Sequence, residues 1–175
     1  MKDEPKPSRA SVLHAVIEEI LTRKDGQIPT NVDGIDRFFN GIEDLTNVLL
    51  LRWHTRLVAS LERGLVDDPE DREEIVIEAW RHATWMYWGV RMVIDELAAN
   101  PPTEAVGQAV QTTARNDWAI MAVTAGLASG FDEAAVRAGH QLEFDARRRN
   151  RAEHSTGRDT QPRTVLDRIK ATITG

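Results

Sequence analysis

Apolar residues recur along this chain at intervals of three and four, and hardly anywhere in strict alternation. The first spacing places them on one face of a helix, whereas alternation would indicate a strand. The pattern predicts five main helices and a short sixth, at about residues 11–24, 33–65, 69–99, 103–130, 132–153 and 165–173. We therefore expect an all-α fold, a single helical bundle of five to six helices around a long central aromatic helix at about 69–99.

Residues that favour turns and helix ends separate these segments. Gly26 is placed to end the first helix, and a break of the second is expected near Asn40-Gly41, because glycine weakens a helix. Asp68 and Pro69 suit the cap and the first position of the central helix. The run Asn100-Pro101-Pro102 then ends it, because the residue before a proline disfavours the helical conformation.

The central helix contains three of the chain's five tryptophans and its single tyrosine within residues 80–88. Its apolar arc is wider than the roughly 100° that an ordinary surface helix buries. Either two neighbouring helices or one neighbour and a partner molecule must cover it, so core, self-association interface and pocket wall all stay open. The candidate binding or interface residues on this helix are the aromatic side chains and a methionine: Trp80, Trp85, Tyr87, Trp88 and Met92.

The next predicted helix, at 103–130, is rich in glycine and alanine, so we expect it to approach the bulky central helix closely. It also carries Asp117, beside its apolar stripe. A carboxylate in such a place needs a partner, and Arg81, Arg91 or Arg115 can supply one as an ion pair. The alternative is a pocket acid with a raised pKa. Asp117 therefore joins the candidate binding residues.

Composition narrows the class of protein. The 175 residues include no cysteine and carry a net charge of −6, which excludes disulfides and thiolate metal sites and makes nucleic-acid binding unlikely. The longest apolar run is too short to cross a membrane. The 18 arginines and 4 lysines, among many alanines, suggest a bacterial source, and we expect a cytoplasmic location.

Polarity divides the chain near its end. Residues 1–153 form the predicted bundle domain, and residues 154–175 a polar linker with a short C-terminal docking helix. The basic residues are concentrated toward this end. The arginine cluster at 147–151 is expected to project into solvent, where it could contact an anion or an acidic partner.

The five histidines give no metal site of recognisable type. Three have a carboxylate at helical spacing, namely His14 with Glu18, His82 with Glu78 and His140 with Glu143. A carboxylate-bridged di-metal bundle needs Glu-x-x-His on two helices, and the chain has none. Phosphate loops, nucleophile elbows and dinucleotide turns are also absent from the sequence. No metal and no cofactor are predicted.

The segment Arg149-Asn150-Arg151-Ala152-Glu153-His154 resembles the Arg-x4-His signature of HEPN nucleases, which are helical domains with this motif late in the chain. The resemblance implies a ribonuclease with Arg149 and His154 as the catalytic pair and Asn150 beside them. That family usually has apolar residues inside the motif, where this chain has Arg151 and Glu153.

The segment Thr30-Asn31-Val32-Asp33-Gly34-Ile35, after an amphipathic helix, is similar to the entry into the DNA-reading motif of TetR-type regulators. These proteins are all-helical and end in a ligand-binding, dimerising bundle. The segment that follows, Ile42-Glu43-Asp44-Leu45, is acidic and would repel phosphate. The resemblance therefore implies a small-molecule-binding bundle without a competent DNA-reading motif.

These observations favour a non-catalytic interaction or regulatory protein that self-associates through the aromatic helix as a homo-oligomer or binds a protein partner. The alternatives are a small-molecule-binding helical module and a HEPN-like ribonuclease. An enzymatic function is the less favoured class, since no catalytic motif beyond the Arg-x4-His segment is found.

Overall fold

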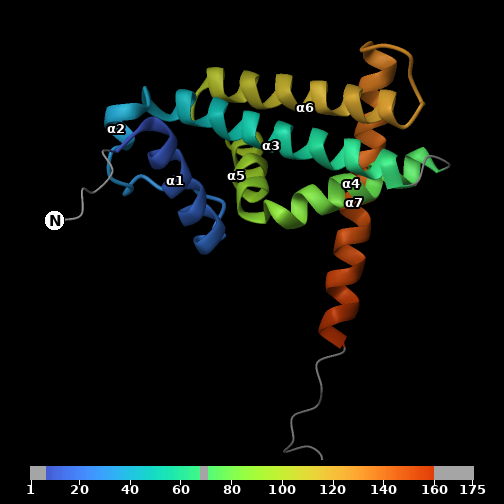
Figure 1. Cartoon of the computed structure of the whole chain (residues 1–175), viewed down its shortest axis with the longest axis horizontal. Helices are drawn as coiled ribbons and strands as arrows, with labels where there is room; N and C mark the ends of the chain where they lie inside the picture. Colours follow the sequence, from blue (N-terminus) through green and yellow to red (C-terminus); the bar gives the residue numbers. More distant parts are fainter. Residues whose placement is uncertain (1–6, 68–70, 160–175) are drawn as a thin grey trace, which may run out of the picture.

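The computed structural model describes residues 7–67 and 71–159, and every regular element in that part of the chain is a helix (Figure 1). The all-α bundle is confirmed. The described residues form seven helices, more than expected: α1 (Arg9–Arg23), α2 (Ile35–Phe38), α3 (Gly41–Asp67), α4 (Arg72–Met86), α5 (Trp88–Ala99), α6 (Glu104–Thr124) and α7 (Glu133–Asp159). No helix among the described residues has the length and apolar character that a membrane crossing requires.

The two long helices α3 and α6 run alongside each other, and α7 crosses them near one end (Figure 1). Helices α1 and α2 lie at the opposite end. The most extensive contacts of α6 are with α7, and α3 contacts α4, α5 and α6. The C-terminal part of α7 extends past the rest of the bundle.

One large core cluster draws on α1 and on α3 to α7, a smaller one lies between α6 and α7, and two tryptophans belong to the large cluster. Trp53 of α3 and Trp80 of α4 are almost fully buried and meet edge to face, with ring centroids 6.1 Å apart. Such aromatic pairs contribute about 0.5–1.5 kcal/mol beyond the burial of their surface. Around them pack aliphatic side chains from α1, α3, α4, α5 and α6, among them Val16, Leu49, Leu57, Val76, Val90 and Val106.

The central aromatic helix does not run unbroken from 69 to 99, which corrects the prediction. It ends at Met86 and restarts at Trp88, and Tyr87 between them has a non-helical ψ of 35°. The turn brings Gly89 against α1, so closely that a Cβ there would lie 2.5 Å from the backbone oxygen of Ile20. The break therefore lets α4 pack on α3 and α7 while α5 packs on α1 and α6. This arrangement buries the wide apolar arc without requiring a partner molecule over all of it.

The closest helix approach involves α6 and α7, which corrects the expectation that α6 packs mainly on the aromatic helix. Gly139 of α7 lies against the α6 backbone, where a Cβ would be 1.8 Å from the carbonyl oxygen of Trp118. Ala119, Ala122 and Ala135 fill the space around this crossing. The small residues of α6 serve a neighbour, as expected, but that neighbour is α7.

Several helix ends differ from the predicted ones. The break near Asn40-Gly41 is confirmed, because α3 begins at Gly41 with a φ of 78°. The predicted cap at Asp68 and Pro69 lies outside the described residues, and α4 is capped by Asp71, which accepts from the backbone N–H of Glu74 at 3.2 Å. Helix α7 continues to Asp159, beyond the linker start predicted at 154. The predicted docking helix at 165–173 lies outside the described residues.

Candidate ligand-binding cavity

A cavity of about 480 Å³ lies between α3, α5, α6 and α7. We call it the central cavity. One part of its wall is apolar and the other holds charged side chains. Its lining residues are Leu50, Trp53, Arg91, Ile94, Asp95, Ala98, Pro101, Gly107, Val110, Gln111, Thr113, Ala114, Asp117, Trp118, Glu143 and Arg147. Pockets of this size, mostly apolar with a few converging polar groups, are the usual form of small-molecule sites.

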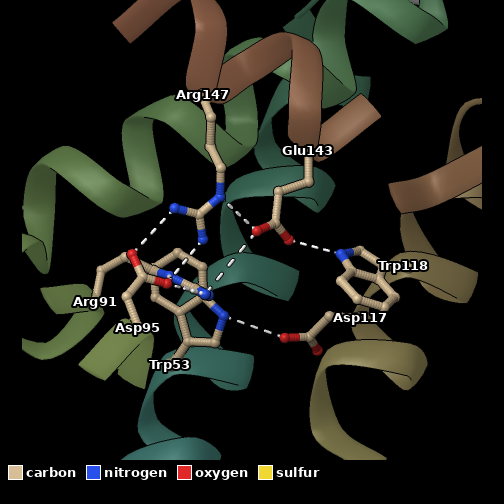
Figure 2. A network of polar contacts seen from close by, with 7 residues as sticks. All are labelled: Trp53, Arg91, Asp95, Asp117, Trp118, Glu143 and Arg147. Carbon is tan, nitrogen blue, oxygen red and sulfur yellow. Dashed lines mark hydrogen bonds and ion pairs between the residues drawn. The ribbon is translucent and has the colours of Figure 1, made fainter. Parts of the chain in front are cut away.

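A network of ion pairs forms the charged wall (Figure 2). Arg147 of α7 donates from Nε to Glu143 at 2.7 Å and from both terminal nitrogens to Asp95 of α5, at 3.0 and 2.8 Å. Arg91 donates to the same Asp95 at 2.6 and 3.0 Å. The second oxygen of Glu143 accepts the indole N–H of Trp118 at 2.7 Å. Charge-assisted bonds of this kind are the stronger hydrogen bonds of proteins.

These contacts favour the charged forms of Asp95 and Arg147. Burial alone would raise the pKa of Asp95, but the hydrogen bonds and charges of Arg147 and Arg91 outweigh it and lower that pKa below its ordinary value of 3.8. Burial likewise works against the charge of Arg147, but the carboxylates of Asp95 and Glu143 raise its pKa. Asp95 and Arg147 are therefore both charged at neutral pH.

Asp117 lies beside this network, and only 4% of its surface is exposed. It accepts the indole N–H of Trp53 at 3.1 Å, as Figure 2 shows, and the Nδ1–H of His54 at 2.6 Å. Neither Arg81, Arg91 nor Arg115 is its contact partner, which corrects the predicted pairing. The partner lies on α3, where a histidine 63 residues away in sequence reaches it.

The ionisation of the Asp117 and His54 pair depends on burial. Burial raises the pKa of Asp117, and the hydrogen bond from His54 offsets this only in part. The hydrogen bond to Asp117 raises the pKa of His54 above 6.5, against the effect of its partial burial. Asp117 thus has the raised pKa that a pocket acid would show, and the pKa of its neighbour His54 is raised as well.

Both arginines of the network also lie over the core tryptophans. The guanidinium carbon of Arg91 is 4.8 Å from the ring centre of Trp53, and that of Arg147 is 5.0 Å from the ring centre of Trp80. Each such contact adds about 0.5–2 kcal/mol, depending on desolvation. The aromatic residues therefore fix the arginines in place as well as filling the core.

A second hollow, of about 340 Å³, lies between the α4–α5 turn and α7. We call it the aromatic groove. Its walls include Trp80, Trp88 and Met92, and His154 stacks on Trp88 with ring centroids 6.0 Å apart. The buried hydroxyl of Thr84 has no hydrogen-bond partner in the described part of the chain.

The structure places the predicted site residues in different parts of the bundle. Trp80 is in the core, Trp88 and Met92 line the aromatic groove, and Asp117 lines the central cavity. Trp85 exposes 74% of its surface at the turn between α4 and α5. Tyr87 is half-buried beneath the guanidinium of Arg56, 4.8 Å away. These residues do not form one pocket.

Of the residues of the Arg-x4-His segment, Asn150 and His154 both line the aromatic groove, whereas Arg149 lies outside it. Arg149 pairs with Glu74 of α4 at 2.5 Å, and the side-chain oxygen of Asn150 accepts from Arg81 at 2.8 Å. His154 lines the aromatic groove, which Arg149 does not. This arrangement gives the nuclease interpretation no geometric support, and it stays a prediction.

The arginine cluster of α7 does not simply project into solvent, which is a further correction. Arg147 and Arg149 turn toward α5 and α4, and Arg148 pairs with Asp145 at 3.1 Å on α7 itself. Within the described residues, no group of three histidine, aspartate or glutamate side chains has the geometry of a metal site.

The segment that resembles the entry of a DNA-reading motif is a loop and turn up to Gly34, and only its last residue, Ile35, belongs to the four-residue helix α2. The helix after it, α3, continues for 27 residues through the bundle. A separate recognition helix is therefore not formed in this part of the chain.

Sequence reasoning missed Asp95, Glu143 and Arg147 as parts of a site. A signal was present, because Arg91 with Asp95 and Glu143 with Arg147 are both opposite charges four residues apart on a helix. Such pairs are common on helix surfaces, so spacing alone did not distinguish these two. The chain matches no protein-family model, no curated protein and no solved structure.

Proposed function

We propose that this protein is a non-catalytic small-molecule-binding bundle whose ligand occupies the central cavity. The observation that carries the proposal is the burial of two carboxylates, Asp117 and Glu143, in the wall of a cavity of about 480 Å³. Burying charge costs several kcal/mol per ion unless it is well paired, and a hydrophobic replacement is often no less stable. Charged groups kept beside an open cavity are therefore better accounted for by recognition than by stability.

The proposal agrees with the bundle that the resemblance to TetR-type regulators implied. The protein would act through its ligand rather than through nucleic acid, since its net charge is −6. Its lack of cysteine and its arginine-rich composition fit a bacterial cytoplasmic protein, and we place the function there.

The test compares the wild type with a variant whose cavity is filled. Ala114 lines the central cavity and is not fully buried, so Ala114→Trp places an indole in the cavity with little disturbance of the core. Native mass spectra of the protein purified from cells should show a small-molecule adduct for the wild type and none for the variant. A library of metabolites should raise the melting temperature of the wild type alone. If no compound distinguishes the two folded proteins, the proposal is wrong.

Self-association through the aromatic helix is the second candidate, because Trp85, Met86 and Trp88 are all exposed around the α4–α5 turn. Exposed tryptophans are frequent binding hot spots. Sedimentation velocity over a range of concentrations should then give a dimer for the wild type and a monomer for Trp85→Ser. A wild type that stays monomeric at all concentrations contradicts this candidate.

A further inference from the structure

The two ends of the central cavity differ in chemistry. Its apolar end lies between α3, α5 and α6 and is formed by Leu50, Ile94, Ala98, Pro101 and Val110. Its polar end carries the network of Figure 2 and Asp117. A ligand that fills such a cavity has an apolar body and a polar head, because a buried polar wall must find partners.

The arginines at the polar end are already engaged by carboxylates. All three nitrogen atoms of the Arg147 guanidinium donate to Asp95 or Glu143. Arg91 donates from two of its nitrogens to Asp95. A carboxylate or phosphate head would have to displace these bonds, so the cavity is not prepared for an anion.

Asp117, by contrast, has no arginine or lysine in contact with it in the described part of the chain. Its contacts are the neutral indole N–H of Trp53 and the ring of His54, which forms an ion pair with it only when protonated, and its carboxylate has lone pairs beyond those two bonds. Arg91 acts on it only through its charge at a distance. A buried carboxylate without an arginine or lysine in contact is the group of this wall that gains most from a cation.

The balance of charge in the cavity lining also favours a cationic ligand. The lining holds two arginines, Arg91 and Arg147, and three acidic residues, Asp95, Asp117 and Glu143. His54, which contacts Asp117 at 2.6 Å, supplies a third positive charge while it is protonated, and its pKa is raised above 6.5 by that contact. When His54 is neutral, an incoming ammonium group makes the numbers equal, and the indole of Trp118 on the same wall attracts cations.

We propose that the ligand of the central cavity is an amine, whose protonated head group contacts Asp117 and whose apolar body lies against the α5–α6 end. This inference rests on the function proposed above and specifies its ligand class. The amine would be primary, secondary or tertiary and not a quaternary ammonium ion, because an N–H group must donate to a carboxylate that accepts. Its body is limited to what a cavity of about 480 Å³ accommodates.

The test uses three probes of equal length, namely hexylamine, 1-hexanol and hexanoate, with the full-length wild-type protein at about pH 8.5, where His54 carries less positive charge than at pH 7 and an alkylamine is still protonated. Trp53 and Trp118 both place their indole N–H groups at the cavity, so their indole signals in a nitrogen–proton NMR spectrum report binding. The signals are assigned by replacing each tryptophan with phenylalanine in turn. Hexylamine should bind about tenfold more tightly than hexanol, since a hydrogen bond to a charged partner contributes about 1.5 kcal/mol or more.

Two variants locate the effect. Asp117→Asn should lower the affinity for hexylamine to that for hexanol, while the affinity for hexanol changes little. Glu133→Gln removes a carboxylate that pairs with Arg115 on the outside of the bundle at 2.5 Å, and it should change neither affinity. The wild-type series stands without these variants, so poor folding of Asp117→Asn would leave the comparison of probes intact.

The outcomes separate the two proposals. Equal binding of hexylamine and hexanol, or tighter binding of hexanoate, overturns the amine and leaves the cavity as a binding site. No change of either indole signal with any probe, together with the absence of a metabolite that distinguishes Ala114→Trp, overturns both. Loss of hexylamine binding in Glu133→Gln would also overturn the assignment to Asp117.

Discussion

Two sets of arginine–carboxylate contacts hold α7 against the bundle, and they differ in how far they reach water. The inner set, Arg91, Asp95, Glu143 and Arg147, lines the central cavity, and the side chain of Glu143 is only 10% exposed. In the outer set, Glu74, Glu78 and Arg149 lie at the surface with 46%, 49% and 37% of their side chains exposed, and only Arg81 is mostly buried, at 15%. The residue types are the same, but the inner set contains the carboxylate and the arginine of the two sets that water reaches least, Glu143 at 10% and Arg91 at 11% exposed, while Asp95 is 40% exposed.

The difference shows that arginine–carboxylate contacts contribute to stability according to how deeply they are buried. Exposed pairs contribute about 0–1 kcal/mol and are screened by salt. A buried carboxylate that loses its place in such a network leaves cations without compensation, which costs far more than the pair itself contributes. The inner set therefore determines how α7 docks, and the outer set adds little.

The largest effect is expected from the inner set. Glu143→Ala removes the acceptor of both Arg147 and Trp118, so urea denaturation should show a loss of about 3 kcal/mol in the free energy of unfolding. Glu143→Gln keeps an oxygen for Trp118 and should lose less. A loss below about 1 kcal/mol for Glu143→Ala would put the inner set in the same class as the outer set.

The next effect is a dependence on pH at the cavity. The pKa of His54 is raised in the folded protein, so its contact with Asp117 stabilises fully below pH 6.5, its ordinary pKa. That stabilisation is lost as pH rises through the folded-state pKa, which lies above 6.5. Melting temperatures measured from pH 6 to 9 should therefore fall for the wild type. His54→Gln should be flatter over this window, and an identical slope in both proteins would contradict the assignment.

A small effect is expected from the outer set. Arg149→Ala should cost about 0.5 kcal/mol at low ionic strength, because its contacts with Glu74 and Glu78 are exposed. The difference from the wild type should vanish at about 1 M salt, where the Debye length is near 3 Å. A loss equal to that of Glu143→Ala would remove the distinction between the two sets.

The smallest effect is expected for Glu78→Gln. Glu78 shares Arg81 with Glu153 and Arg149 with Glu74, so each arginine keeps another carboxylate after the change. Chemical denaturation should differ from the wild type by less than about 0.5 kcal/mol. A larger loss would mean that the outer contacts act together as one network.

The fold could be predicted from the sequence because the helical period is clear in every main segment and the turns carry glycine or proline. The break at Tyr87 was missed, since residues 80–94 contain no proline and only Gly89 interrupts their helical pattern. What decides it is the contact of Gly89 with the backbone at Ile20. Contacts between residues so far apart in sequence leave no local trace in the chain.

The candidate site was predictable only in part for the same reason. Asp117 stood out because a carboxylate beside an apolar stripe is unusual, and the structure places it in a cavity wall. Its partner His54 is on another helix, and no spacing rule connects the two. In the sequence, Arg147 is one of several arginines in a basic run. Its contact with Asp95 on another helix becomes visible only in the structure.

Arg91, Asp95 and Arg147 face the central cavity on one side and the aromatic groove on the other. The partition between the two hollows is thus a single layer of side chains held together by charge. A shorter residue at any of these three positions would merge two compartments into one, and a longer one would enlarge one compartment at the other's expense. The capacity of each hollow therefore depends on α5 and α7 together, and a variant at one of these three positions alters both volumes.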